Sequence, residues 1–114
     1  MPPPETFPQR QEKVEIEPTP GPRSVASLQM MEQARLLIQE NRPDEAIRTL
    51  ERAVNLHPTN GGNYYYLAEA WLMKGNVRQA REFHGLAAVY LRDHAEWKNR
   101  LKTQQERISG GSRE

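Results

Sequence analysis

The chain has no cysteine among its 114 residues. This absence excludes disulfide bonds, thiolate catalysis and cysteine-ligated metal sites, although it does not distinguish an intracellular protein from an exported one. Long apolar runs are also missing, since no stretch approaches the ~18 residues of a membrane-spanning helix. The first ten residues, MPPPETFPQR, have no charged n-region and no apolar core of a signal peptide. The sequence given therefore predicts neither a membrane span nor a signal peptide.

An excess of charge of one sign is absent as well. Lysine and arginine number 16 against 15 aspartates and glutamates, which leaves a formal net charge of +1. Proteins that bind nucleic acid or an anionic membrane surface usually carry a clustered basic excess. The balance therefore favours a protein or peptide partner over nucleic acid.

Motifs that carry catalysis are not found. The three histidines are His57, His84 and His94. The stretch HAE at 94–96 matches the H-x-E of zinc deaminases, but no cysteine completes such a site. No glycine-rich phosphate loop and no Ser-His-Asp pattern appears. We therefore expect a protein that is not an enzyme, with no catalytic residue, no cofactor and no metal.

The N-terminal segment differs in composition from the rest of the chain. Seven of the nine prolines fall in the first 22 residues, interleaved with charged and amide side chains. Such a composition buries too little apolar surface to fold alone. We expect residues 1–23 to form a disordered tether. A passive spacer is the first interpretation, and a proline-rich recognition motif the second, although no clear P-x-x-P core with a basic flank stands out.

The same segment bears on localisation. It resembles the tether that follows the lipid-modified cysteine of bacterial lipoproteins, with Met1 standing where a signal segment was removed. We expect a lipoprotein-like domain in the bacterial periplasm or envelope. A cytoplasmic module with a loose tail would have the same sequence features.

From Ser24 the composition changes to good helix formers. Breaks at NRPDE, HPTNGGN and KGN divide the chain into helices near 25–40, 43–56, 62–74 and 77–91. Pro43 suits a first helical position, and Asn60 or Asn63, and Asn76 with Gln79, suit N-caps. A fifth helix, 93–108, would begin at a cap formed by Asp93 and Glu96. The folded domain is thus 24–108, and 109–114 is predicted to be a disordered tail.

The fifth helix carries one narrow apolar stripe on an otherwise charged surface. We expect it to cap the domain by covering helix 77–91. The stripe consists of Trp97, Leu101, Gln104 or Gln105, and Ile108.

Small residues recur at a spacing of 34 positions. Ala46 and Ala53 are matched by Ala80 and Ala87, and Asn41 by Gly75. With Ala34, Ala68 and Pro58, these positions resemble two tetratricopeptide repeats, at 27–60 and 61–94. The second copy matches best, on Tyr64, Leu67, Ala68, Trp71, Gly75, Ala80 and Ala87. Gln33 and His84 depart from the family pattern, which has leucine or a large aromatic residue there.

The resemblance implies an all-α fold of stacked helix-turn-helix units, a fragment of a right-handed solenoid, with the fifth helix as its cap. It also implies a concave groove that binds a protein or peptide segment. The groove positions of the family fall on Leu28, Met31, Arg35 and Ile38, and on Gly62, Tyr65, Glu69 and Leu72.

One known variant of this groove is absent. Part of the family holds a C-terminal carboxylate with lysine and asparagine, and here Met31, Arg35 and Tyr66 stand at those places. Arg35 alone could hold a carboxylate, but a pair with Glu32 or Glu69 is the preferred interpretation.

Three consecutive tyrosines, 64–66, cannot share one face of a helix, because neighbouring helical residues point ~100° apart. We expect Tyr64 to pack between two helices, Tyr65 to point into the groove and Tyr66 to lie toward the adjacent helix. The resulting function is a protein-binding adaptor or assembly scaffold. The alternative is a structural homo-oligomer, for example a homodimer, that buries the same apolar surface.

Overall fold

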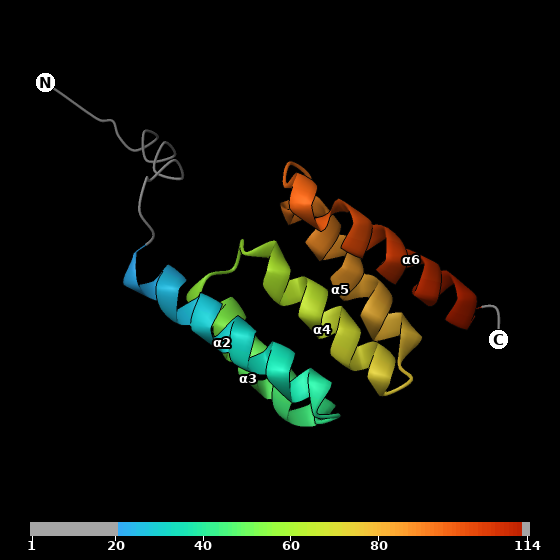
Figure 1. Ribbon diagram of the computed structural model, residues 1–114, viewed down its shortest axis with the longest axis horizontal. Coiled ribbons are helices and arrows are strands. Elements are labelled where there is room, and N and C mark those ends of the chain that lie inside the picture. The colour runs from blue at the N-terminus through green and yellow to red at the C-terminus, as the bar shows by residue number, and fades with distance from the viewer. Residues whose placement is uncertain (1–20, 113–114) are drawn as a thin grey trace, which may run out of the picture.

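The computed structural model describes residues 21–112, and within that range every long element is a helix. The predicted all-α fold with five helices is confirmed, and Figure 1 shows the helices side by side along the molecule. They are α2 (Pro22–Gln39), α3 (Pro43–Leu56), α4 (Gly61–Met73), α5 (Val77–Tyr90) and α6 (Lys98–Ser112), with a short 3-10 helix η3 (Ala95–Trp97) before α6. Most of the predicted tether and the last two residues of the predicted tail lie outside the described residues.

Most of the predicted helix starts are found. Pro43 opens α3, with Asp44 in the first turn, where a carboxylate faces the positive end of the helix dipole. The Asn60 side chain accepts a hydrogen bond from the Gly62 amide at 3.0 Å, so Asn60 is the cap of α4. The Asn76 side chain accepts one from the Gln79 amide, also at 3.0 Å.

The structure corrects three predicted boundaries. Helix α2 begins at Pro22, before the predicted start near residue 25, because proline is well suited to a first helical position. The cap predicted at Asp93 is wrong. The His94 amide donates to the Leu91 carbonyl and the Trp97 amide donates to the His94 carbonyl. Because these two tight turns come first, α6 begins only at Lys98. Helix α6 then continues to Ser112, through part of the predicted tail, and Gln105 hydrogen bonds to Ser109 one turn on.

The two repeats end their first helices in the same way. Asn41 and Gly75, 34 residues apart, both have positive φ, 63° and 79°. In each case the following amide reaches back five residues, from Arg42 to the Leu37 carbonyl and from Asn76 to the Trp71 carbonyl, both at 2.9 Å. This is a Schellman motif, in which a left-handed residue closes the helix. The 34-residue period of the sequence therefore appears also in the backbone conformation.

The effect of positive φ on stability can be tested with two matched glycine substitutions. We expect Gly75→Ala to lower the free energy of unfolding by about 1 kcal/mol, because an L-residue is strained at positive φ. Gly85→Ala, inside α5, should raise it by about 0.5 to 1 kcal/mol, because alanine restricts the unfolded chain and favours helix. A Cβ atom would meet nothing within 4 Å at either position, so packing does not contribute. Urea denaturation followed by circular dichroism measures both, and a change of the same sign in the two variants would contradict this explanation.

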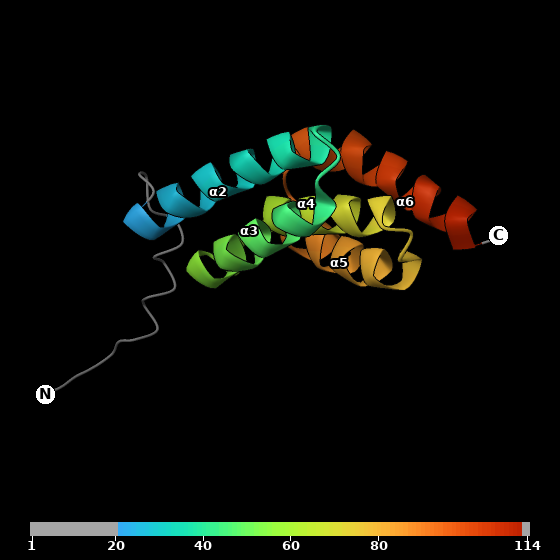
Figure 2. The same cartoon turned by 90° about the horizontal axis from the view of Figure 1, so that it is seen from below.

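The helices form two layers. Figure 2 shows α2 and α6 on one side and α3 and α5 on the other, with α4 in the middle of the molecule. The layers approach closely because the contact positions are alanines with no exposed surface, as predicted: Ala34, Ala46, Ala53, Ala68, Ala80 and Ala87.

The two departures from the family pattern have different outcomes. Gln33 is exposed, so a polar side chain there removes nothing from the core. His84 is buried, and its Nδ1 lies 2.8 Å from the side-chain oxygen of Gln104 in α6. A polar residue at this core position is therefore satisfied by a polar residue of the fifth helix.

Candidate partner-binding face

Helices α2, α4 and α6 together make one face of the molecule. Helix α4 lies between the other two and contacts both. The predicted groove residues of α2 and of α4 follow one another at helical spacings of three and four, so each set shares one side of its helix. The structure joins the two sets where the sulfur of Met31 and the ring of Trp97 both lie against Gly62.

Gly62 is what permits this approach. A Cβ atom at Gly62 would lie 2.7 Å from the Met31 sulfur and 3.1 Å from the Trp97 ring, both closer than ordinary contact. The glycine thus lets residues from three helices meet over the first turn of α4. It was expected as a groove position, and it serves as the floor on which Met31 and Trp97 rest.

Trp97 is not where the sequence placed it. It was expected to cover helix 77–91, whereas its ring lies against α4, 5.3 Å from the ring of Tyr65 and 6.1 Å from that of Tyr66. The reason is the pair of tight turns before α6, which bring residue 97 back over α4 before the helix begins. The rest of the stripe covers the core as predicted, with Gln104 and Ile108 fully buried.

Tyr65 and Tyr66 pack edge to face against each other, with ring centroids 5.0 Å apart. Both are half-buried, so Tyr65, which was expected to point into the groove, is only partly exposed. Neither hydroxyl has a hydrogen-bond partner among residues 21–112. Burial raises the pKa of Tyr65 to about 12 and also raises the pKa of Tyr66. Both phenols therefore stay neutral at pH 7 and can donate a hydrogen bond.

Tyr64 takes the role that the sequence gave it. It is buried, and its ring stacks on those of Tyr90 and Phe83 in α5 at 5.6 and 6.4 Å. Its hydroxyl donates to the Pro58 carbonyl at 2.6 Å. Tyr64 therefore holds α4 to α5 and contributes to the fold, while its two neighbours line the face.

The charged residues of the face are mostly paired. Arg35 Nε donates to a Glu32 oxygen at 2.9 Å, as the sequence favoured, and this hydrogen bond lowers the pKa of the exposed Glu32. Glu69 pairs with Arg107 at 2.9 Å and accepts a hydrogen bond from Gln104 at 2.8 Å. Arg100 is the exception: its guanidinium lies 4.6 Å from the centre of the Trp97 ring, and no carboxylate pairs with it among the described residues.

Gln104 is the central residue of a polar network that fixes α6. Its amide group donates to the Tyr65 carbonyl at 3.0 Å and to Glu69, while its oxygen accepts from His84. Because Gln104 is fully buried, these bonds together hold α6 in one register against α4 and α5. Trp97 and Arg100 are positioned on the face by this register.

The outer predicted residues are less closely gathered. Leu28 is 44% exposed at the start of α2. Ile38 and Leu72 are half-buried and pack against the core, Leu72 against the cluster of Ala68, Ala80 and Ile108. The predicted strip is therefore concentrated at its middle, around Met31, Arg35, Tyr65 and Glu69.

Sequence reasoning missed Trp97 and Arg100 as members of this face, and it placed Tyr66 toward the adjacent helix although Tyr66 stands at a carboxylate-holding place of the family. A signal was present: Glu32, Tyr66 and Arg100 are successive positions of the 34-residue period. Extending the period into a third copy would have placed Arg100 beside Tyr66. Burial is the main cause that raises the pKa of the Tyr66 phenol, while the nearby Arg100 and Arg35 lower it and Glu32 raises it.

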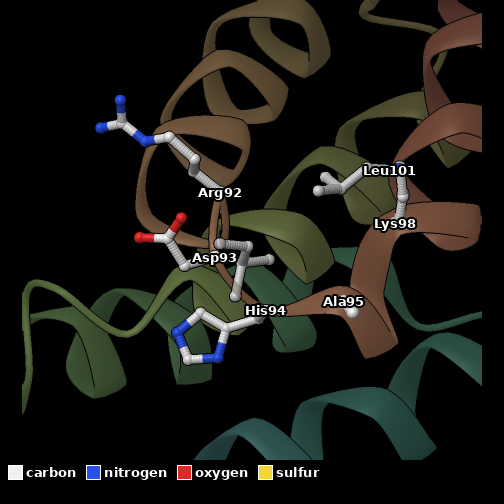
Figure 3. A pocket seen from close by; sticks show the side chains of 7 residues that line it. Arg92, Asp93, His94, Ala95, Lys98 and Leu101 are labelled. Carbon is white, nitrogen blue, oxygen red and sulfur yellow. The ribbon is translucent and has the colours of Figure 1, made fainter.

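A hollow lies at the turn between α5 and α6, with a cavity volume of about 280 Å³. Figure 3 shows the side chains of Arg92, Asp93 and His94 directed outward from the turn, and Lys98 and Leu101 coming from α6. These polar groups do not converge on one point, and the His94 and Glu96 side chains of the HAE motif are exposed and 3.9 Å apart. Within residues 21–112 no group of three or more acidic, histidine or cysteine residues is placed to hold a metal ion. In the same range, no helix is long and apolar enough to cross a membrane.

Comparison with known proteins supplies the family. A family model described as tetratricopeptide repeat matches residues 37–104, which is 68 of the 114 residues. Neither the curated proteins nor the solved structures gave a match. The match covers both repeats from the end of α2 onward and reaches into α6, where the third copy of the period lies. With paired helices repeating every 34 residues and alanines at each close contact, the chain belongs to the tetratricopeptide repeat family.

Proposed function

We propose that the face of α2, α4 and α6 binds a segment of a partner protein, and that the chain is a non-enzymatic adaptor or assembly scaffold. Tetratricopeptide repeats are typically modules for protein-protein interaction without catalysis of their own. The observation that carries the proposal is the aromatic cluster of Tyr65, Tyr66 and Trp97, with Arg100 stacked on it. Tyrosine, tryptophan and arginine are the residues that most often dominate binding energy at interfaces.

The polar groups of the cluster support the same proposal. The two phenol hydroxyls have no partner among the described residues, and the Arg100 guanidinium has only the Trp97 ring. Groups of this kind can form hydrogen bonds with a partner without first breaking internal ones. Met31 and the Arg35–Glu32 pair flank the cluster on α2, so a bound segment would cross from α2 to α6.

Peptide selection tests the proposal without requiring the identity of the partner. We expect a random peptide library, selected on the immobilised full chain, to yield binders whose affinity falls about tenfold or more in Tyr66→Ala. Tyr66 suits this test because its hydroxyl has no internal bond, so the loss of fold stability should be small. Lys102→Ala is the matched control, since Lys102 is exposed on α6 and lies ~200° around the helix from Arg100. Isothermal titration calorimetry gives the affinities.

Two results would contradict the proposal. The first is that selected peptides bind Tyr66→Ala as well as they bind the unchanged chain. The second is a molar mass, measured by light scattering, that falls on dilution in the unchanged chain but not in the variant. That result would favour the alternative of a homo-oligomer that buries the same apolar surface.

A further inference from the structure

A second apolar surface lies between α3 and α5, with α4 as its floor. It contains a cleft of about 190 Å³, lined by Glu51, Val54 and Asn55 of α3, Tyr64 and Leu67 of α4, and Phe83 of α5. Small-molecule sites usually measure ~300 to 1,000 Å³, so this cleft is small for a metabolite. It suits a single apolar side chain or the rings of a short peptide.

Aromatic rings and exposed apolar side chains continue this surface along α5. Tyr90 stacks on Tyr64 and is 37% exposed, while Leu86 and Val89 are 40% and 53% exposed. Phe83, Leu86 and Tyr90 follow one another at helical spacings of three and four, so they share one side of the helix. An exposed apolar surface of this kind commonly marks an interaction site.

The chain itself contains a segment of matching chemistry. Aromatic-lined grooves are the usual docking sites of proline-rich segments, because a polyproline helix is extended and loses little entropy on binding. Residues 1–20 hold six prolines and one aromatic residue, Phe7, which Pro8 follows. At ~3.1 Å per residue, 20 residues in this conformation reach about 60 Å.

This segment also enters the domain next to the cleft. Helix α2 begins at Pro22, and the side chain of Arg23 in its first turn donates to the Asn55 carbonyl at 3.1 Å. Asn55 lines the cleft. A tethered segment that starts here has a high effective concentration at the cleft, in the millimolar range for short flexible linkers.

Charge at the rim is compatible with this occupant. Glu51 on the rim is exposed, and no lysine or arginine among the described residues pairs with it. Arg10 follows Phe7 by three residues, which places a cation within reach of Glu51 when Phe7 occupies the cleft. Of the four glutamates of the segment, Glu15 and Glu17 flank Ile16, which makes Ile16 the poorer anchor, while Glu5 and Glu12 stand two and five residues from Phe7 in the sequence.

We propose that the cleft between α3 and α5 binds the proline-rich segment of its own chain, residues 1–20, with Phe7 as the anchor against Val54 and Phe83. The segment would then act as a recognition motif and not as a passive spacer, the other role that its composition allows. This interaction uses a surface separate from the face of α2, α4 and α6, so it can hold or fail independently of the proposed function.

The absence of cysteine allows a direct test. A single introduced cysteine, Gln9→Cys, can be labelled with a nitroxide without competing thiols. We expect loss of amide signal intensity in NMR spectra at Val54, Asn55 and Phe83, and none at Thr103 on α6. Adding Phe7→Ser to the labelled chain should restore those signals. Ile16→Ser is the matched control and should leave them weakened.

Each other outcome overturns the proposal. If the amide signals do not weaken, or weaken evenly over the domain, the cleft does not bind the segment. Weakening that persists in Phe7→Ser removes Phe7 as the anchor. A mixture of nitroxide-labelled chain and isotope-enriched unlabelled chain reports contacts between molecules. If the amide signals weaken in that mixture as much as they do in the labelled chain, the segment binds the cleft of a second copy. Because Phe7 and Ile16 precede residues 21–112, neither variant changes a residue of the described helices.

Discussion

Trp97→Ala should lower the free energy of unfolding by about 3 kcal/mol, which is a large part of the stability of a domain this small. The ring packs against Tyr65 and Tyr66, supports the Arg100 guanidinium and covers Gly62. Its removal leaves a gap over the first turn of α4, where glycine provides no side chain to fill the space. The loss arises from packing of η3, which directly precedes α6, on the first turns of α4.

Urea denaturation followed by circular dichroism would measure this effect, with Lys98→Ala as the control one residue away on an exposed site. Trp97→Phe should recover part of the loss, since it retains an aromatic ring over Gly62. If Trp97→Ala unfolds with an unchanged midpoint, α6 is held by Gln104, Leu101 and Ile108 alone. The aromatic cluster would then be available for binding at no cost to stability.

Trp97 also shows where the sequence was insufficient. Its apolar spacing with Leu101 and Ile108 correctly predicted a capping helix, because an amphipathic stripe indicates which side of a helix is buried. The stripe does not say which helix it meets. That depends on the two tight turns between Leu91 and Trp97, whose hydrogen bonds join backbone groups and leave no residue pattern.

The features set by local chemistry were predictable. Asn60 and Asn76 cap their helices through bonds to amides two and three residues away, and Gly75 closes α4 because it tolerates positive φ. The alanine period found the close contacts because only a small side chain fits there. The link between His84 and Gln104 joins residues 20 positions apart on different helices, so neither residue alone indicated it.

The candidate face was predicted in part for the same reason. Helical spacing placed Met31, Arg35, Tyr65 and Glu69 on one side of their helices, and the structure agrees. Whether such residues are exposed depends on what covers them, and Trp97 half-buries Tyr65. A test of binding on this cluster must therefore measure the stability of each variant as well as its affinity.

Tyr64→Ala should be the most damaging of the tyrosine substitutions, with a loss of about 4 kcal/mol in the free energy of unfolding. The ring is only 8% exposed, stacks on both Phe83 and Tyr90, and forms part of the floor between α3 and α5. Its replacement leaves a cavity between α4 and α5 that alanine cannot fill. Tyr64→Phe keeps the ring and removes only the bond to Pro58, so it should cost about 1 kcal/mol.

The matched comparison is Tyr66→Ala, two residues along the same helix, which should cost less than half as much because its ring is half-buried and its hydroxyl has no internal partner. Thermal and urea denaturation of the three variants give the order directly. Equal losses for Tyr64→Ala and Tyr66→Ala would mean that α4 is held equally from both sides. The interpretation that one side of α4 holds α5 and the other side is available to a partner would then be wrong. A binding face on α4 requires that Tyr66→Ala lowers the free energy of unfolding less than Tyr64→Ala does.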